Sequence, residues 1–117
     1  MMGEYVFEDI DYNNDPDWVV KEFFNSINLC GRFLDSVEKI LDRRGFVINE
    51  TYFYPPDLNG ADPDLYFDGL MFGVWEGEVV VPESAALEYL IAACERYVVL
   101  HPKDADKVKS LLVRLNA

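Results

Sequence analysis

The chain has 117 residues, of which half are hydrophobic and 15% are aromatic, and this is enough apolar material for the core of one folded domain. Its 22 acidic and 10 basic residues give a formal net charge of -12 at pH 7, and such a field excludes nucleic acid as a partner because it repels phosphates. We therefore expect a single domain over residues 1–117.

The N-terminal segment, residues 1–14, is predicted to be an acidic arm. Tyr5, Phe7 and Ile10 are its apolar side chains, and we expect them to hold it against the body of the protein. The arm carries acids where a signal peptide carries basic residues. No apolar run in the chain approaches the ~20 residues that a membrane span needs. We therefore expect a cytoplasmic protein that does not interact with membranes.

Residues 15–45 are predicted to be helical because apolar residues recur there at helical spacing. Asp15 is expected to be the N-cap and Pro16 the first helical residue, and Gly45 is expected just beyond the helix end. Weak helix formers gather near residues 28–31. The segment should therefore form either two helices or one bent helix.

Residues 46–82 are predicted to form a β-sheet. Residues 46–54 are predicted to form one strand whose side chains point alternately to two faces, with Phe46 and Tyr52 on one face and Phe53 on the other. A second strand is expected over residues 66–75. Turn-forming residues fill the segment between the two strands.

A third strand is expected after a two-residue turn at Glu76 and Gly77. This turn would pair Val74 with Val79 and Phe72 with Val81. One face of the hairpin is then wholly apolar and must pack on helices, while the other face stays open. The apolar face consists of Leu70, Phe72, Val74, Val79 and Val81.

Residues 83–117 are predicted to form two helices. His101 and Pro102 separate them, because a proline disfavours helical geometry in the residue before it, and Asp104 can cap the last helix. The element order is therefore α(α)-β-β-β-α-α. It indicates an α+β fold with a small antiparallel sheet of about three strands and helices packed on one face.

Residues 46–88 contain nine carboxylates and no Lys or Arg. Solvated surfaces normally mix both signs of charge, so this segment favours a basic protein as partner. The alternative, that the charge serves only solubility, stays open. The same segment supplies aromatic anchors of the kind found at protein interfaces, namely Tyr52, Phe53, Tyr54, Tyr66, Phe67, Phe72 and Trp75.

Residues suited to catalysis or metal binding are few. His101 is the only histidine, no nucleophile motif accompanies it, and a helix C-terminus is its expected place. The acidic loop 57–64 invites a calcium site but departs from the EF-hand pattern. Cys30 and Cys94 are expected to be small core residues, although a disulfide stays open. We therefore expect no enzyme activity, no metal and no cofactor.

The C-terminal half resembles a known family. The run FGVWEGEVVV at residues 72–81 leads into a helix with ACERY at 93–97, and HPKD at 101–104 then precedes a Leu-rich helix. This order resembles immunity proteins of bacterial contact-dependent growth inhibition systems, of the kind paired with ribonuclease toxins, over roughly residues 66–115. The resemblance implies a cytosolic protein that binds the toxin of a neighbouring gene and blocks its active site or substrate groove. It assigns no role to any single residue.

The leading hypothesis is a non-enzymatic inhibitor that binds a cognate basic nuclease toxin one to one. The oligomeric state is left open, and the chain is assumed to be a monomer. The expected surface combines the loop 57–68 with the hairpin tip 75–78, where acids pair with toxin Lys and Arg and aromatic residues anchor the contact. One alternative is an acidic cytosolic protein-binding adaptor or regulatory module with no toxin partner. Another is a small enzyme or calcium-binding domain that uses the loop 57–64. The expected partner-binding residues are Asp57, Asp62, Asp64, Tyr66, Asp68, Trp75, Glu76 and Glu78.

Overall fold

The computed structural model of the chain describes residues 5–57 and 59–116. It confirms the α+β fold, with four antiparallel strands instead of three. The helices and strands are α1 (Trp18–Leu29), α2 (Phe33–Leu41), β1 (Phe46–Ile48), β2 (Thr51–Tyr54), β3 (Leu70–Val74), β4 (Gly77–Val81), α3 (Glu83–Leu100) and α4 (Ala105–Val113). Short 3-10 turns occur at Pro63–Leu65, Pro102–Asp104 and Arg114–Asn116.

The first helical segment consists of two helices, the first of the two predicted alternatives. The chain leaves α1 at Gly31, whose φ of +74° suits a glycine. There the amide of Arg32 donates to the carbonyl of Ile27 at 2.9 Å, which satisfies a carbonyl at the helix end. The predicted N-cap is wrong, because α1 begins after Asp17, and the Asp15 carboxylate instead accepts from the Asp17 amide at 2.9 Å.

The end of α2 also differs from the prediction. Arg43, not Gly45, takes the left-handed conformation beyond the helix, with φ of 55°. The Arg43 amide donates to Ile40 at 3.0 Å, and the Arg44 amide donates to Lys39 at 2.9 Å. Gly45 serves another purpose, because a Cβ there would overlap the ring of Tyr54 on the sheet.

The predicted single strand over residues 46–54 is wrong. It is a hairpin of β1 and β2 that turns at Asn49 and Glu50, with Asn49 at φ of 56°. Phe46 pairs with Phe53, so the two rings share one face at 6.0 Å between centroids. A turn within the segment therefore places together two residues that an unbroken strand would separate.

The register of the second hairpin is shifted by two residues from the prediction. Phe72 pairs with Val79 and Leu70 with Val81, so the turn lies at Trp75 and Glu76. A shift of two keeps every side chain on its predicted face, because side chains alternate with a period of two. The apolar face therefore packs on the helices as predicted.

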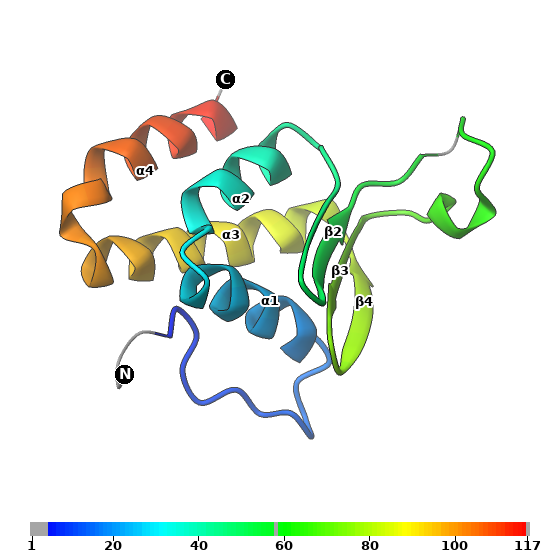
Figure 1. The fold of residues 1–117 in the computed structure, drawn as a ribbon, viewed down its shortest axis with the longest axis horizontal. Helices are drawn as coiled ribbons and strands as arrows, with labels where there is room; N and C mark the ends of the chain where they lie inside the picture. Colours follow the sequence, from blue (N-terminus) through cyan, green and yellow to red (C-terminus); the bar gives the residue numbers. More distant parts are fainter. Residues whose placement is uncertain (1–4, 58, 117) are drawn as a thin grey trace.

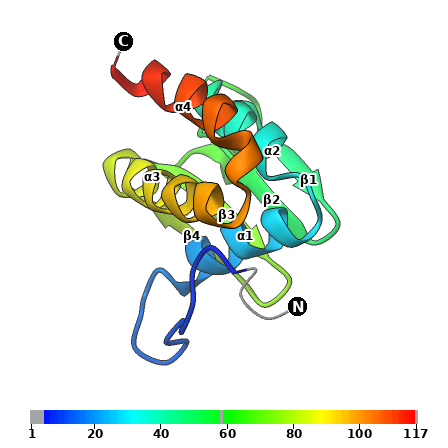
Figure 2. The same ribbon diagram turned by 90° about the vertical axis from the view of Figure 1, so that its left-hand side faces the viewer.

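The helices cover one face of the sheet, and a hairpin loop projects away from them. Helix α1 packs on β2, β3 and β4, and α3 packs against α1 (Figure 1). Helices α2 and α4 lie side by side above them (Figure 2). The loop of residues 55–57 and 59–69 extends beyond the sheet on the side opposite the helices (Figure 1). The core between the layers is rich in phenylalanine, with Phe23, Phe24, Phe33, Phe53 and Phe72 fully buried.

The N-terminal arm packs beside α1, but only some of the side chains that were predicted to hold it there do so. Phe7 packs on the core as expected, and Val6 is buried although its position in the sequence did not single it out. Tyr5 is exposed, and Ile10 is only partly buried. The arm is therefore held mainly through Val6 and Phe7.

The two cysteines have different environments, and both are free thiols. Cys94 is buried in α3 as predicted, and burial raises the pKa of its thiol to about 12. The core prediction for Cys30 is wrong, because this residue lies exposed just after α1, where the chain turns away. His101 lies at the C-terminal end of α3 as predicted, with its ring 4.4 Å from that of Tyr97.

Candidate protein-binding surface

The basic residues of the chain all lie in the helices or their connections. Most of them pair with a carboxylate of the same region, as Lys21 does with Asp15 and Lys39 with Asp35. Arg43 reaches across to Glu83, which is the one acid of residues 46–88 that pairs with a base in the described part of the chain. The charge of the helical layer is therefore largely balanced.

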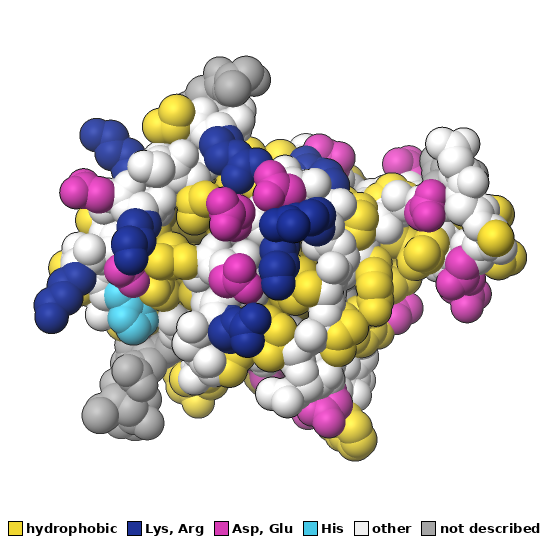
Figure 3. Space-filling model, turned by 45° about the horizontal axis from the view of Figure 1, so that its top comes forward, with side chains coloured by type: hydrophobic (Ala, Val, Ile, Leu, Met, Phe, Trp, Pro, Cys, Tyr) yellow, Lys and Arg dark blue, Asp and Glu magenta, His cyan; other side chains and the backbone are white. Residues whose placement is uncertain are grey.

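The sheet and the projecting loop carry acids without such balance. In the described ranges, no Lys or Arg forms an ion pair with the carboxylates of Glu50, Asp57, Asp62, Asp64, Asp68, Glu76 and Glu78. Figure 3 shows Lys and Arg side chains over the helical part of the molecule and only acids among the charged side chains of the projecting loop. The two regions therefore present different potentials, and the sheet side is strongly negative.

The open face of the sheet is built around a glycine. The register aligns Tyr52, Gly73 and Glu78 across three strands. Because Gly73 has no side chain, the ring of Tyr52 lies flat over it, where a Cβ would overlap three ring carbons. The Tyr52 hydroxyl then donates to Oε1 of Glu78. Burial is the larger cause, and this hydrogen bond the second, of a rise in the pKa of Tyr52 to about 12.

A hollow of about 570 Å³ lies between this face and the loop. We call it the sheet-face hollow. It combines an apolar floor with three carboxylates, and its lining residues are Val47, Tyr52, Tyr54, Asp62, Asp64, Leu65, Met71 and Glu78.

The loop that forms one wall of this hollow is held by its own hydrogen bonds. The Asp57 amide donates to the Leu65 carbonyl at 2.9 Å, and the Tyr66 hydroxyl donates to the Gly60 carbonyl. Oδ1 of Asp62 accepts from the amide of the residue two positions later at 3.0 Å, which starts the 3-10 turn. These bonds fix the position of the loop acids without using any residue of the helices.

A second hollow, of about 400 Å³, lies near the tips of both hairpins and the end of α1. We call it the hairpin-tip hollow. Trp75 is 76% exposed beside it, and Leu29 is also exposed. Its acids are Glu22, Glu50 and Glu76. Aromatic and acidic groups therefore meet here as well.

The eight predicted binding residues do not gather in one place. Asp62, Asp64 and Glu78 share the sheet-face hollow, whereas Trp75 and Glu76 border the hairpin-tip hollow. The loop and the hairpin tip lie at opposite ends of β3 (Figure 1). The three others, Asp57, Tyr66 and Asp68, lie on the loop and line neither hollow.

Sequence reasoning missed the role of Tyr52 and Tyr54 in shaping a hollow. The alternation over residues 46–54 placed both on one face, as they are, but did not indicate their neighbours. Gly73 could have indicated the role of Tyr52, because a glycine within a strand often marks a place where another group approaches the backbone closely. Using that signal required the correct strand pairing.

The described residues contain no group of three or more His, Cys, Asp or Glu side chains placed to hold a metal ion. Within the same part of the chain, no helix is long and apolar enough to cross a membrane. Aromatic side chains such as the exposed Trp75 are of the kind enriched at protein interfaces.

Comparison with known families gives one finding. The model of the CDI immunity protein, the immunity protein of contact-dependent growth inhibition, matches residues 16–112. No curated protein matches the chain. The matched segment runs from just before α1 into α4 and omits the N-terminal arm. Because this match spans well over half of the sequence, the chain belongs to the CDI immunity protein family.

Proposed function

We propose that the chain neutralises a CDI toxin with a basic nuclease domain by binding that domain one to one, without catalysis. Family membership supplies the coarser part of this function, immunity against a CDI toxin. The choice of a basic nuclease domain as the partner is supported by one observation. The helical layer has balanced charge, whereas the sheet side is acidic.

A nuclease toxin is the partner whose charge best matches the acidic sheet side. Nucleases bind the phosphate backbone through Lys and Arg side chains, so their substrate grooves are basic. An acidic surface with aromatic residues can cover such a groove and exclude the nucleic acid. Opposite potentials also speed association, by roughly 10–10³-fold at low salt.

The proposed contact surface is the sheet and its projecting loop, residues 46–82. Its acids and aromatic residues would meet the toxin's Lys and Arg in the cytoplasm, where the toxin's substrate lies. The proposed contacts from the sequence remain Asp57, Asp62, Asp64, Tyr66, Asp68, Trp75, Glu76 and Glu78.

Co-expression with the toxin domain encoded by the neighbouring upstream gene tests this function. We expect normal growth, intact cellular nucleic acid and co-purification of the two chains at equal amounts. Association measured by stopped flow should slow at least about tenfold when NaCl is raised from about 50 to about 500 mM. Failure of the well-expressed chain to restore growth would contradict the proposal.

A matched pair of charge reversals tests the surface. Asp68→Lys changes the acidic loop, whereas Asp106→Lys makes the same change on α4, and neither carboxylate has an ion-pair partner among the described residues. We expect Asp68→Lys to slow association by about threefold or more and Asp106→Lys to slow it less. Equal effects of the two variants would count against the sheet side as the contact surface.

A further inference from the structure

We propose that the sheet-face hollow receives an arginine side chain of the toxin, with its guanidinium stacked on Tyr52 and paired with Glu78 and the two loop aspartates. This inference rests on the proposed function and names the group that the surface recognises. It concerns a hollow that is lined by carboxylates from the loop and from the sheet together with the ring of Tyr52.

The ring of Tyr52 provides a flat platform. One side of the ring lies on the backbone of Gly73, and its hydroxyl is fixed by Glu78. The other side of the ring faces the hollow, because the ring lies parallel to the sheet. The ring of Tyr54 stands next to it at 5.7 Å between centroids. A planar cation can therefore stack on a surface that is already in place.

Three carboxylates around this platform keep free oxygens. Oε1 of Glu78 accepts from Tyr52, which leaves Oε2 available. Oδ1 of Asp62 accepts a backbone amide, which leaves its second oxygen available. The carboxylate of Asp64 forms no hydrogen bond or ion pair with another described residue. The hollow therefore offers several acceptors for one cationic group.

The rest of the hollow fits the stem of the same side chain. Val47, Leu65 and Met71 supply apolar contacts for methylene groups, which long basic side chains bury beside their charged ends. A volume of about 570 Å³ also leaves room for the residues that flank an arginine in an extended segment.

Arginine fits this arrangement better than lysine. Its guanidinium is planar, stacks on aromatic faces and donates to carboxylates with two parallel hydrogen bonds. The lysine ammonium is a compact, strongly hydrated charge that gains less from a flat ring. The hairpin-tip hollow fits less well, because its aromatic lining residue, Trp75, is 76% exposed, whereas Tyr52 is held between Gly73 and Glu78.

The experiment measures association and dissociation rates of the chain with the catalytically inactivated toxin domain of the neighbouring gene. Asp62→Asn with Asp64→Asn removes two charges inside the hollow, and the amide oxygen that replaces Oδ1 of Asp62 can still accept the bond that starts the turn. Glu88→Gln with Glu95→Gln is the matched control, because it removes the same charge from exposed residues of α3 that lie outside the hollow and outside the proposed contact surface. Far-UV circular dichroism and thermal melting verify folding of each variant.

We expect the double variant inside the hollow to dissociate at least about tenfold faster than the unchanged chain, because it loses direct contacts. The control should mainly slow association, since it alters only the long-range field. Equal dissociation rates for the two double variants would overturn the inference and leave the proposed function standing. No binding by the unchanged chain would overturn both.

Two changes of Tyr52 test the stacking. Tyr52→Phe keeps the ring and should change the dissociation rate by less than about threefold, whereas Tyr52→Leu removes the ring and should raise it about tenfold. Replacing the docked toxin arginine with lysine should weaken binding to the unchanged chain about tenfold. The same toxin change should weaken binding to the Tyr52→Leu variant little further, because the ring on which the arginine stacks is already missing. Equal losses for Tyr52→Phe and Tyr52→Leu, or no toxin arginine that behaves this way, would overturn the inference.

Discussion

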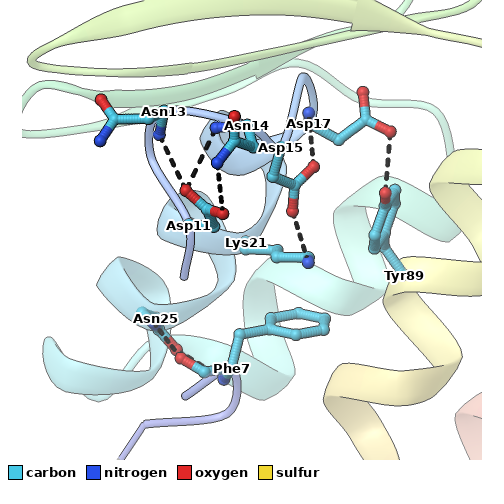
Figure 4. Close-up of polar contacts among 9 residues, drawn as sticks. All are labelled: Phe7, Asp11, Asn13, Asn14, Asp15, Asp17, Lys21, Asn25 and Tyr89. Carbon is cyan, nitrogen blue, oxygen red and sulfur yellow. Dashed lines mark hydrogen bonds and ion pairs between the residues drawn. The ribbon is translucent and has the colours of Figure 1, made fainter. Parts of the chain in front are cut away.

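The N-terminal arm lies outside the family match, and a side chain of α1 forms hydrogen bonds with its backbone beside the buried Val6 and the packed Phe7. Asn25 is 4% exposed, and it forms two hydrogen bonds with the backbone of a single arm residue. Its Oδ1 accepts from the amide of Phe7 at 2.9 Å, and its Nδ2 donates to the carbonyl of Phe7 at 2.9 Å (Figure 4). We predict that Asn25→Ala detaches the arm and destabilises the protein.

The size of this effect follows from the interactions that the substitution removes. Two hydrogen bonds contribute about 0.5–1.5 kcal/mol each, and release of the arm also exposes the buried Val6. The pair of Arg96 with Glu8 is partly exposed and adds little. We expect the free energy of unfolding to fall by about 3 kcal/mol or more. For a chain of 117 residues this lowers Tm by about 12 °C or more.

Thermal melting, urea unfolding and amide hydrogen exchange test the prediction. Asn13→Ala is the control, because Asn13 is exposed and its one hydrogen bond among the described residues runs from its backbone amide to Asp11. The control should change Tm by less than about 2 °C, as surface substitutions usually do. If Asn25→Ala changed Tm no more than Asn13→Ala, and the Phe7 amide stayed protected, the reasoning about the arm would be refuted.

Three further predictions concern stability and reactivity. Gly69→Ala should destabilise the protein by about 3 kcal/mol or more in urea unfolding, since φ is +119° there and a Cβ would overlap the carbonyl of Val81. Gly31→Ala, where φ is +74° and space is open, should cost only about 1 kcal/mol, and the opposite order would contradict the structure. A thiol reagent should modify exposed Cys30 in the folded protein and Cys94 only after unfolding, so two fast-reacting thiols would be inconsistent with the fold. Stability should be fully present below pH 10 and should decline as the pH rises towards 12, because several tyrosines have a pKa raised from 10.0 to about 12 in the folded state. A urea midpoint that stays constant from pH 9 to pH 12 would contradict these shifts, which belong to Tyr12, Tyr52, Tyr89 and Tyr97.

The apolar faces of the elements were predictable from the sequence because they depend on short-range periodicity. The face of the second hairpin was correct although its register was not, since alternation survives a shift of two residues. The break between α1 and α2 also followed from local composition near Gly31. Such features need no knowledge of distant residues.

Two features that the sequence did not predict are residues other than glycine in the left-handed conformation, one of them fixed in part by a residue distant in the chain. Arg43 adopts a conformation that usually favours glycine, and its side chain is fixed by a bond to the Ile40 carbonyl at 2.8 Å and by a pair with Glu83. The turn at Asn49 lacks the following glycine that marks many two-residue hairpins, so the alternation of the segment indicated one strand.

The same distinction applies to the proposed binding surface. The excess of acids over residues 46–88 is a property of composition and was predictable. Which acids share a hollow depends on the pairing of β2 with β3 and on the fold of the loop. The sequence therefore predicted the kind of surface, but it joined the loop to the hairpin tip, which lie at opposite ends of β3.

The tyrosines of the open face serve the sheet as well as the proposed contact. Tyr52 covers Gly73 and Tyr54 covers Gly45, so each ring protects backbone that would otherwise meet water. This coverage lets the face remain open without a layer of helices upon it. It also means that loss of the Tyr52 ring lowers stability and affinity together. The Tyr52→Phe variant keeps both the cover over Gly73 and the ring face on which a cation stacks, and it removes only the hydrogen bond to Glu78, so it isolates the contribution of the hydroxyl.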